Sequence, residues 1–457
     1  MKISRRRLLA GLAGAGVSTP ALSASRRVRP PNVVFIMADD LGAHDLSCYG
    51  RPDYKTPNID KLGADGLILD QAYANSPTCS PTRTALISGQ YQYRYPVGVY
   101  DPLPRGNQEI GYPPAAQSLP RLFSRAGYQT ALIGKWHLGS LPLYGPLRSG
   151  YGEFFGPMDS AMDYISHRAM GAGPKAPSML FQGEETVEVS GYATDLFSDR
   201  ACDLVKRWRR DPFFLSLHYT APHFPWQAPQ DAPTDERITG NHDSGSHAVY
   251  ARMVAALDAG VGRVLKELER QGLGDDTIVV FTSDNGGERY SYQWPLRGSK
   301  SEVWEGGIRV PAIIRWPGRL PRIRSQLPMM TMDWLPTLLD LVEAKTDDTP
   351  VFDGLNLKEA MKAPASNLNR AMFWRTHDMA AVRQGPWKYV REDKREYLFD
   401  LSTDPGERAN LRRRRPDIAV SMRDRFEQWN LEMLPVPEDA KRPRVTLRQE
   451  FEALNRP

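Results

Sequence analysis

Asn32-Val-Val-Phe-Ile-Met37, followed directly by Ala38-Asp39-Asp40-Leu41-Gly42, is the stretch that decides the fold of this chain. A continuous apolar run of this length predicts a β-strand that is buried on both faces of a sheet. A buried strand gains no stability from two adjacent aspartates at its end. The pair Asp39 and Asp40 therefore indicates a functional site where the strand stops.

Three further apolar runs end in the same way, in polar side chains that can carry charge: Thr130-Ala-Leu-Ile133 before Lys135 and His137, Phe213-Phe-Leu-Ser-Leu217 before His218 and His223, and Thr277-Ile-Val-Val-Phe281 before Asp284 and Asn285. Helical patterns at residues 118–126, 193–209 and 248–271 separate these runs. Strands that alternate with helices predict an α/β fold with a large, mostly parallel sheet flanked by helices. Ligands of open α/β sheets bind at the carboxyl ends of the strands, which is where these polar residues stand.

The acidic residues at two of these strand ends suggest a metal site. Asp39, Asp40 and Asp284 with the amide of Asn285 form a set of hard oxygen ligands suited to Ca²⁺, Mg²⁺ or Mn²⁺ and not to zinc. A simple turn is an alternative for Asp284 and Asn285 alone, because Asn-Gly favours tight turns.

A second stretch, Asn75-Ser-Pro-Thr-Cys79-Ser-Pro81-Thr-Arg83-Thr-Ala-Leu-Ile-Ser-Gly89, carries the nucleophile candidate. It predicts a helix that begins at Cys79, with Pro81 in the first turn, where a missing N–H costs nothing. Arg83 follows about one turn later. A cysteine between a helix N-terminus and a fixed cation is expected to be activated. The alternative is a buried small hydrophobic residue, as most isolated cysteines are.

The second half of the chain predicts a loop and then a smaller unit. A glycine-rich loop from about residue 288 should bring Lys300 to the sheet edge, before a strand at 312–316 and a helix at 332–343. The polar stretch at 344–353 predicts a boundary between a catalytic domain at 31–345 and a C-terminal subdomain at 346–457. Short strands at 371–375, 380–383, 387–390 and 397–400 predict a small antiparallel sheet, with a closing helix at 418–432. The run Arg412–Arg415 is interpreted as a solvated face.

The N-terminal residues 1–25 read as an export signal. They contain Lys2 and the run Arg5-Arg-Arg7 with no acidic residue, and the paired arginines before Leu8-Leu9 are typical of a twin-arginine signal. Without these four cations the formal charge of +5 falls to 5 − 4 = +1, which gives no electrostatic case for nucleic acid. No later segment predicts a membrane span. We therefore expect export by the twin-arginine translocation machinery to the periplasm or beyond.

The chain has three cysteines, Cys48, Cys79 and Cys202. They are too few for a disulfide framework, and an odd number cannot all be paired within the chain. Cys48 and Cys202 are interpreted as structural, with a bond between them left open.

Cys79-Ser-Pro-Thr-Arg-Thr-Ala-Leu-Ile-Ser-Gly89 resembles the signature of the type I, formylglycine-dependent sulfatases of the alkaline phosphatase superfamily. The resemblance covers residues 32 to about 410 and recurs, in family order, at Ala38-Asp-Asp-Leu-Gly42, Gly134-Lys-Trp-His-Leu-Gly139, Ala221-Pro-His223, Ser283-Asp-Asn-Gly286, Arg297-Gly-Ser-Lys300 and Trp304-Glu-Gly-Gly-Ile-Arg309. It implies an arylsulfatase-like sulfuric ester hydrolase that cleaves aryl or carbohydrate sulfates.

The resemblance also implies a role for each site residue. A formylglycine-generating enzyme would oxidise Cys79 to formylglycine, whose hydrated aldehyde is the nucleophile. One divalent cation, usually Ca²⁺, would be held by Asp39, Asp40, Asp284, Asn285 and the modified Cys79. The other roles would be divided as follows: Arg83 as the anchor of the diol, Lys135 and Lys300 as sulfate ligands, His137 as base, and His223 as acid together with Lys300.

Two other histidines and two alternative functions are also open to interpretation from the sequence. His218 is interpreted as a buried residue whose hydrogen bonds are satisfied. His167, in Asp163-Tyr-Ile-Ser-His167, has two interpretations: a residue of a substrate-side loop that contacts substrate, or one that does not. A formylglycine-dependent phosphonate or phosphate monoester hydrolase is the alternative enzyme, because both substrates are tetrahedral oxyanions. A non-catalytic glycan-binding relative is a third function, but a binding protein has no need of Cys79.

Overall fold

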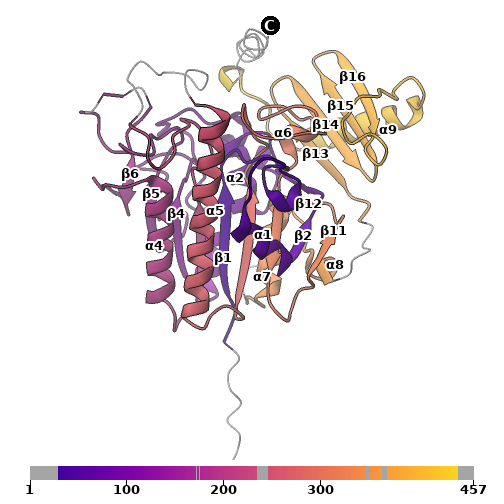
Figure 1. Ribbon diagram of the computed structural model, residues 1–457. Coiled ribbons are helices and arrows are strands. Elements are labelled where there is room, and N and C mark those ends of the chain that lie inside the picture. The colour runs from indigo at the N-terminus through magenta and orange to yellow at the C-terminus, as the bar shows by residue number, and fades with distance from the viewer. Residues whose placement is uncertain are drawn as a thin grey trace, which may run out of the picture.

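The computed structural model describes residues 29–170, 172–173, 175–233, 245–345, 350–362 and 368–440. Its centre is a ten-stranded sheet with the strand order β11-β2-β10-β9-β1-β8-β4-β5-β6-β7 (Figure 1). In chain order these strands are β1 (Asn32–Ala38), β2 (Leu67–Leu69), β4 (Gln129–Gly134), β5 (Glu153–Pro157), β6 (Leu180–Gln182), β7 (Glu185–Thr186), β8 (Phe213–His218), β9 (Thr277–Ser283), β10 (Ala312–Arg315) and β11 (Ile323–Ser325). A separate two-stranded pair consists of β3 (Ala72–Tyr73) and β12 (Met329–Met330).

The middle of the large sheet is parallel, as the sequence predicts. β9, β1, β8, β4 and β5 pair in parallel with their neighbours, whereas β10 is antiparallel to β9 and β6 is antiparallel to β5. The four predicted strands are confirmed as β1, β4, β8 and β9, within two residues at each end. The strands that the sequence analysis missed, β2, β5, β6, β7 and β11, have only two to five residues and carry little pattern.

Helices cover both faces of this sheet. In chain order the helices of the described residues are α1 (Pro57–Ala64), α2 (Cys79–Ser88), α3 (Leu119–Arg125), α4 (Ala193–Arg207), α5 (His247–Arg270), α6 (Glu305–Ile308), α7 (Trp334–Leu341), α8 (Lys358–Lys362) and α9 (Pro416–Asn430), of which α9 packs on the small C-terminal sheet instead. All seven residues of β1 are buried, and their side chains alternate between two cores. Phe35 and Met37 pack with α2, α3 and α7, while Ile36 and Ala38 pack with α1, α4 and α5. This explains why β1 is apolar throughout.

Local signals fix the helix ends. The hydroxyl of Ser118 accepts a hydrogen bond from the Arg121 N–H, and that of Ser246 accepts one from the Val249 N–H, so each serine caps the helix that follows it. Gly89 ends α2 with φ of +69°, and a Cβ there would lie 2.7 Å from the Phe352 ring. The predicted helix at 332–343 is shorter in the structure, because residues Thr331–Asp333 form a 3₁₀ turn before α7.

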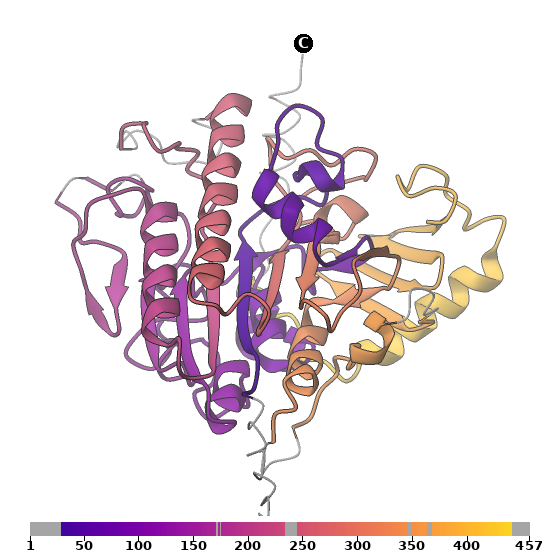
Figure 2. The same ribbon diagram turned by 60° about the horizontal axis from the view of Figure 1, so that its bottom comes forward.

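A four-stranded antiparallel sheet forms the C-terminal part, with strands β13 (Ala371–Arg375), β14 (Met379–Gln384), β15 (Trp387–Glu392) and β16 (Arg395–Asp400) in that order. It lies at one side of the molecule together with α9, on the side of the large sheet away from α4 (Figures 1 and 2). The predicted small sheet and its closing helix are thus confirmed. The division of the chain at residue 345 into two domains stays a prediction.

Among the described residues, no helix combines the length and the apolar character needed to cross a membrane. The predicted export signal at 1–25 lies outside the described residues.

Candidate active site

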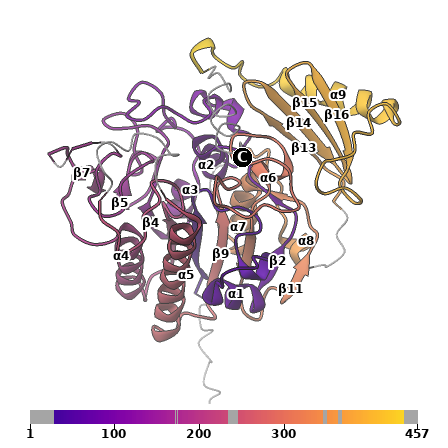
Figure 3. The same ribbon diagram turned by 45° about the horizontal axis from the view of Figure 1, so that its top comes forward.

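The carboxyl ends of four neighbouring strands converge at the upper edge of the large sheet in Figure 1, and Figure 3 turns this edge toward the viewer. The four strands are adjacent in the order β9-β1-β8-β4, with β1 near the middle. Backbone hydrogen bonds continue past the strand ends: the Asp39 N–H donates to Ala221 O (3.1 Å), the Asp284 N–H to Ala38 O (3.2 Å) and the Lys135 N–H to His218 O (2.8 Å). The predicted site residues are therefore held in fixed register.

Asp39 and Asp40 lie at the centre of this edge and are both buried. Asp40 has φ of +62°, a left-handed conformation that costs about 1–3 kcal/mol for a residue with a side chain and that is typical of functional sites. Its N–H donates to Asp284 Oδ1 (3.2 Å), and its Oδ1 accepts from the Asn285 amide (2.7 Å). The structure thus brings together all four predicted oxygen-ligand residues.

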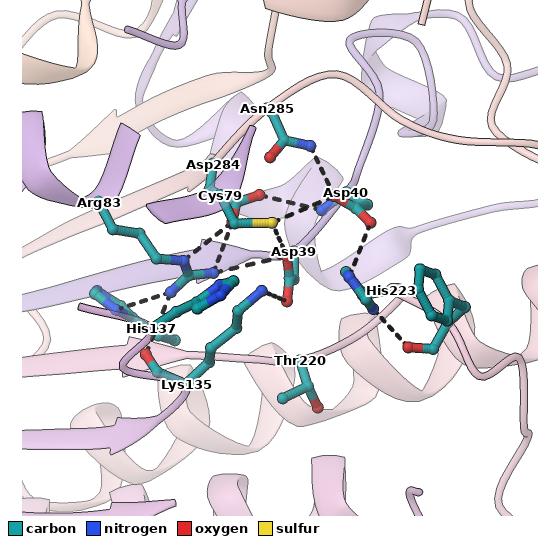
Figure 4. A network of polar contacts seen from close by, with 12 residues as sticks. Asp39, Asp40, Cys79, Arg83, Lys135, His137, Thr220, His223, Asp284 and Asn285 are labelled. Carbon is teal, nitrogen blue, oxygen red and sulfur yellow. Dashed lines mark hydrogen bonds and ion pairs between the residues drawn. The ribbon is translucent and has the colours of Figure 1, made fainter. Parts of the chain in front are cut away.

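Cys79 is the first residue of α2, and its side chain points at the two aspartates (Figure 4). Its Sγ lies 3.4 Å from Asp39 Oδ1 and 3.9 Å from Asp40 Oδ1. Ligand atoms of Asp39, Asp40, Cys79 and His223 all lie within 4.8 Å of one another. The nucleophile candidate and the acidic pair therefore form one cluster.

The surroundings of Cys79 oppose the activation of its thiol that the sequence predicts. Burial raises the pKa of the Cys79 thiol well above its usual value, and the carboxylate of Asp284 adds to this rise. Lys135 acts in the opposite direction but does not compensate. The helix terminus and Arg83 favour a thiolate, but the carboxylates of Asp284 and Asp39, which lie far from Cys79 in the sequence, oppose it.

Arg83 lies one turn after Cys79 and is fully enclosed. Its Nη2 and Nε donate to Asp284 Oδ2 (2.8 and 3.1 Å), and its Nη1 donates to Lys135 O (3.2 Å). The same Nη1 lies 3.4 Å from Nδ1 of His218, a nitrogen that accepts because the guanidinium has only donors. The interpretation of His218 as buried is confirmed, but it is only half satisfied, since its Nε2 has no partner among the described residues.

Two lysines contact the acidic pair, Lys135 from the end of β4 and Lys300 from the loop after β9. Lys135 Nζ lies 2.6 Å from Asp39 Oδ2, and Lys300 Nζ lies 2.6 Å from Asp40 Oδ2. Burial acts to lower both lysine pKa values, but the adjacent aspartates outweigh it and raise them. The predicted loop that brings Lys300 to the sheet edge is confirmed, and it contains a short helix, α6, that the sequence analysis missed.

His137 is buried behind Lys135, with φ of +61°. Its Nε2–H donates to Leu103 O (3.2 Å), which fixes the tautomer, and its Nδ1 has no partner among the described residues. Burial and the charges of Lys135 and Arg83 lower its pKa well below the usual range. A neutral imidazole with a free lone pair at Nδ1 is equipped to accept a proton.

His223 lies on the Asp40 side of the cluster. Its Nδ1–H donates to Phe224 O (2.5 Å), and its Nε2 lies 3.5 Å from Asp40 Oδ2. His223 is only 4% exposed, and burial together with the charge of Lys300 lowers its pKa well below the usual range. The roles of His137 as base and of His223 as acid stay predictions.

His167 does not reach the cluster. Its Nε2 lies 2.9 Å from Gly191 O and its Nδ1 lies 3.2 Å from Val189 O, so the ring fastens its own loop to the segment before α4. Of the two readings left open for His167, the structure therefore supports a structural role.

Two residues near the cluster escaped the sequence analysis. Ser80 Oγ accepts the N–H of Leu103 (2.7 Å), and the carbonyl of the same Leu103 accepts from His137. Leu103 thus links the residue after Cys79 to the predicted base. Ser80 stands within the quoted signature, but nothing in the sequence pairs it with position 103.

The residues present fit the divalent cation that the family implies. Asn285 Oδ1 is buried and has no hydrogen-bond partner among the described residues, so it is an acceptor available to a cation. Asp39 and Asp40 add carboxylate oxygens beside it, and oxygen ligands of this kind are those that Ca²⁺ and Mg²⁺ prefer.

Comparisons with known proteins agree with this geometry. The family model of the sulfatases matches residues 31–344. N-acetylgalactosamine-6-sulfatase of Canis lupus familiaris is 32% identical over 409 residues, which cover 84% of this chain and 74% of the relative. Arylsulfatase J of Mus musculus is 29% identical over 477 residues, which cover 91% of this chain and 78% of the relative.

A solved structure shares the fold over nearly its whole length. The crystal structure of Ps i-CgsB in complex with k-i-k-neocarrahexaose matches with a TM-score of 0.81 and 29% identity, covering 94% of this chain and 98% of the other. The chain therefore belongs to the sulfatase family, within the alkaline phosphatase superfamily, and is a sulfuric ester hydrolase.

Proposed function

We propose that the protein hydrolyses sulfate monoesters of carbohydrates, or aryl sulfates in the assay tube, with a formylglycine derived from Cys79 and one bound divalent cation, most simply Ca²⁺. The observation that carries the proposal is the cluster of Cys79, Asp39, Asp40 and His223 within 4.8 Å, flanked by the two lysines. A sugar as the alcohol half is supported by the relatives, one of which is named for N-acetylgalactosamine and another of which was solved with an oligosaccharide.

Asp39, Asp40, Asp284, Asn285 and the modified residue 79 would hold the cation. When bound, the cation would offset charge on the sulfate oxygens, and the hydrated aldehyde would supply a hydroxyl nucleophile that a thiol cannot replace in turnover.

The chain's own side chains would bind and orient the ester. Lys135 and Lys300 approach the cluster from two sides, and their ammonium groups would bind sulfate oxygens through charge-assisted hydrogen bonds. Arg83 is fixed by Asp284 and by the Lys135 carbonyl, so it is already oriented before substrate arrives.

Three side chains would move protons. His137 would accept a proton at Nδ1, the nitrogen that the hydrogen bond to Leu103 leaves free. Lys300 and His223 both lie beside Asp40 Oδ2, at 2.6 and 3.5 Å, and we assign proton donation toward the leaving oxygen to this pair.

Maturation would need two partners. A formylglycine-generating enzyme would convert Cys79, and the twin-arginine machinery would carry the chain to the periplasm or beyond. The test of the modification is the mass of the tryptic peptide from Leu62 to Arg83, in which an aldehyde should replace the thiol. A fully active preparation with an unmodified peptide would contradict the proposal.

The test of the reaction is kcat/KM for an aryl sulfate against the matching aryl phosphate and phosphonate monoesters, with Ca²⁺ and then Mn²⁺, using protein from a host that installs formylglycine. We expect a clear preference for the sulfate and no turnover by Cys79→Ala. A preference for the phosphorus esters would overturn the substrate class but keep the residue roles. Full activity of Cys79→Ala would overturn the nucleophile.

A further inference from the structure

A cluster of arginines on the C-terminal unit stands apart from the catalytic edge. The run Arg412–Arg415 precedes α9, and Arg423 and Arg425 of that helix add two more cations. Residues 412–425 contain six arginines and two aspartates, which gives 6 − 2 = +4 within 14 residues. Since the chain without its first 25 residues carries only 5 − 4 = +1, this is a local concentration of charge and not a property of the whole surface.

Half of these arginines are neutralised. Arg412 pairs with Glu396 (2.5 Å), Arg415 with Asp417 (3.0 Å) and Arg423 with Asp424 (3.3 Å).

The other three arginines are not neutralised. Arg413, Arg414 and Arg425 are exposed and form no ion pair with any described residue. Three exposed guanidinium groups without an ion pair, on α9 and its leading turn, leave this part of the surface positively charged.

Two grooves flank α9 on this surface. One, of about 450 Å³, lies between the β14–β15 turn and α9, and its lining includes Trp387, Gln384 and Arg425. The other, of about 240 Å³, lies between β16 and α9, and its lining includes Arg412, Arg413 and Arg423. The run at 412–415 is exposed, as the sequence predicts for a solvated face, and Arg412 and Arg413 also border the smaller groove.

The larger groove has the composition of a sugar site. Trp387 is half-buried on its wall, with the Arg415 guanidinium 5.3 Å from the ring centroid. Side-chain amides of Asn369 and Gln384 line the same groove and offer both donors and acceptors for hydroxyl groups. An aromatic wall, amides and a bordering cation suit a sugar that carries an anionic group.

We propose that the face formed by α9, its leading arginine turn and these two grooves binds a sulfated polysaccharide at a distance from the ester being cleaved. This inference rests on the proposed function, because it takes the substrate to be a sulfated glycan. It assigns Arg413, Arg414 and Arg425 as sulfate ligands and the groove beside Trp387 as the sugar site. The occupant is a polymer and not a monosaccharide, since the face is a separate surface from the catalytic cluster.

The experiment measures binding and catalysis separately. Dextran sulfate and uncharged dextran, both fluorescently labelled, are titrated against the Cys79→Ala protein by anisotropy at 50 and 200 mM NaCl. The test variant adds Arg413→Ala, Arg414→Ala and Arg425→Ala to this background. The matched control adds Lys55→Ala, Arg210→Ala and Lys266→Ala, three exposed cations elsewhere, so that both proteins lose the same charge.

We expect the Kd for dextran sulfate to rise at least about tenfold in the test variant and less than about twofold in the control, because only the test variant removes the cations of the proposed binding face. Uncharged dextran should bind neither the test variant nor the control variant. With Cys79 present, the three arginine substitutions should leave kcat/KM for an aryl sulfate unchanged.

Three results would overturn the inference. The first is an equal Kd for dextran sulfate in the test and control variants, and the second is a Kd for single-stranded RNA of matched charge as low as that for dextran sulfate. The third is a loss of aryl sulfate turnover in the variant that lacks the three arginines. Absence of aryl sulfatase activity in the unsubstituted protein is a different result. It would refute the proposed function, and the binding data would still decide whether this face holds sulfated glycans.

Discussion

Lys388 on β15 offers the sharpest test of how the C-terminal sheet supports the catalytic loop. Its Nζ lies 2.9 Å from Glu305 Oε1 and 2.8 Å from Glu407 Oε1, and all three side chains have no exposed surface. Glu305 begins α6, five residues after Lys300, so this ion network joins the C-terminal sheet to the loop that carries a predicted sulfate ligand. The perturbation is Lys388→Met, which keeps the length of the side chain and removes its charge.

The expected loss of unfolding free energy depends on the partners that each carboxylate retains. Glu305 Oε2 still accepts from Arg309 (2.5 Å) and from the Tyr73 hydroxyl (2.8 Å), whereas Glu407 has no other ion-pair partner among the described residues. Removing one partner of a buried ion pair leaves an uncompensated charge and costs about 3–5 kcal/mol. We expect Lys388→Met to lower the free energy of unfolding by this amount.

The assay is urea unfolding followed by tryptophan fluorescence at pH 7.5. Lys394→Met, in the exposed β15–β16 turn, is the control and should change the free energy of unfolding by less than about 0.5 kcal/mol. The double variant Lys388→Met/Glu407→Gln should recover a large part of the loss, because no uncompensated carboxylate remains. A loss below about 1 kcal/mol in the single variant, or no recovery in the double variant, would refute this reasoning.

The remaining predictions concern the site and its pH dependence. Ser80→Ala removes the acceptor for the Leu103 N–H. It should lower kcat about five- to tenfold, the effect of losing roughly 1 kcal/mol of hydrogen bonding, and leave KM nearly unchanged. Ser80→Thr should restore kcat, and a rise in KM without a fall in kcat would contradict the link through Leu103 to His137. Asn285→Ala should weaken Ca²⁺ binding at least about tenfold by calorimetry, and an unchanged affinity would remove Asn285 from the ligand set. Burial raises the pKa of Glu407 to about 7 from an ordinary 4.5, so the folded state holds more protons than the unfolded state between these values. Unfolding free energy should therefore fall as the pH rises from 4.5 to 7, and Glu407→Gln should flatten that decline; an equal decline in both proteins would show that another group titrates.

The parts that sequence could predict are those in which the signal is local. Asp39 and Asp284 each follow an apolar run, and a strand direction is enough to place both at one edge. Lys135, after β4, is placed by the same logic.

The parts that sequence could not predict depend on pairs distant in the chain. Nothing near Lys388 signals that it meets Glu305, 83 residues earlier, and nothing near Leu103 signals that it meets His137. The protonation state of a site histidine is out of reach for a related reason. The pKa of His223 depends on how deeply the assembled fold buries it, and a motif does not carry that information.

The burial of Cys79 constrains when its proposed oxidation to formylglycine would take place. The residue is 1% exposed, and its helix is buried along its whole length. An enzyme that oxidises this cysteine needs the peptide in an open form, so it must act on the chain before the sheet closes over it. A twin-arginine signal, by contrast, carries chains that are already folded. Under the proposed function, these two requirements would place the oxidation of Cys79 in the cytoplasm, during or soon after synthesis, and a chain that folds before the oxidation would stay inactive.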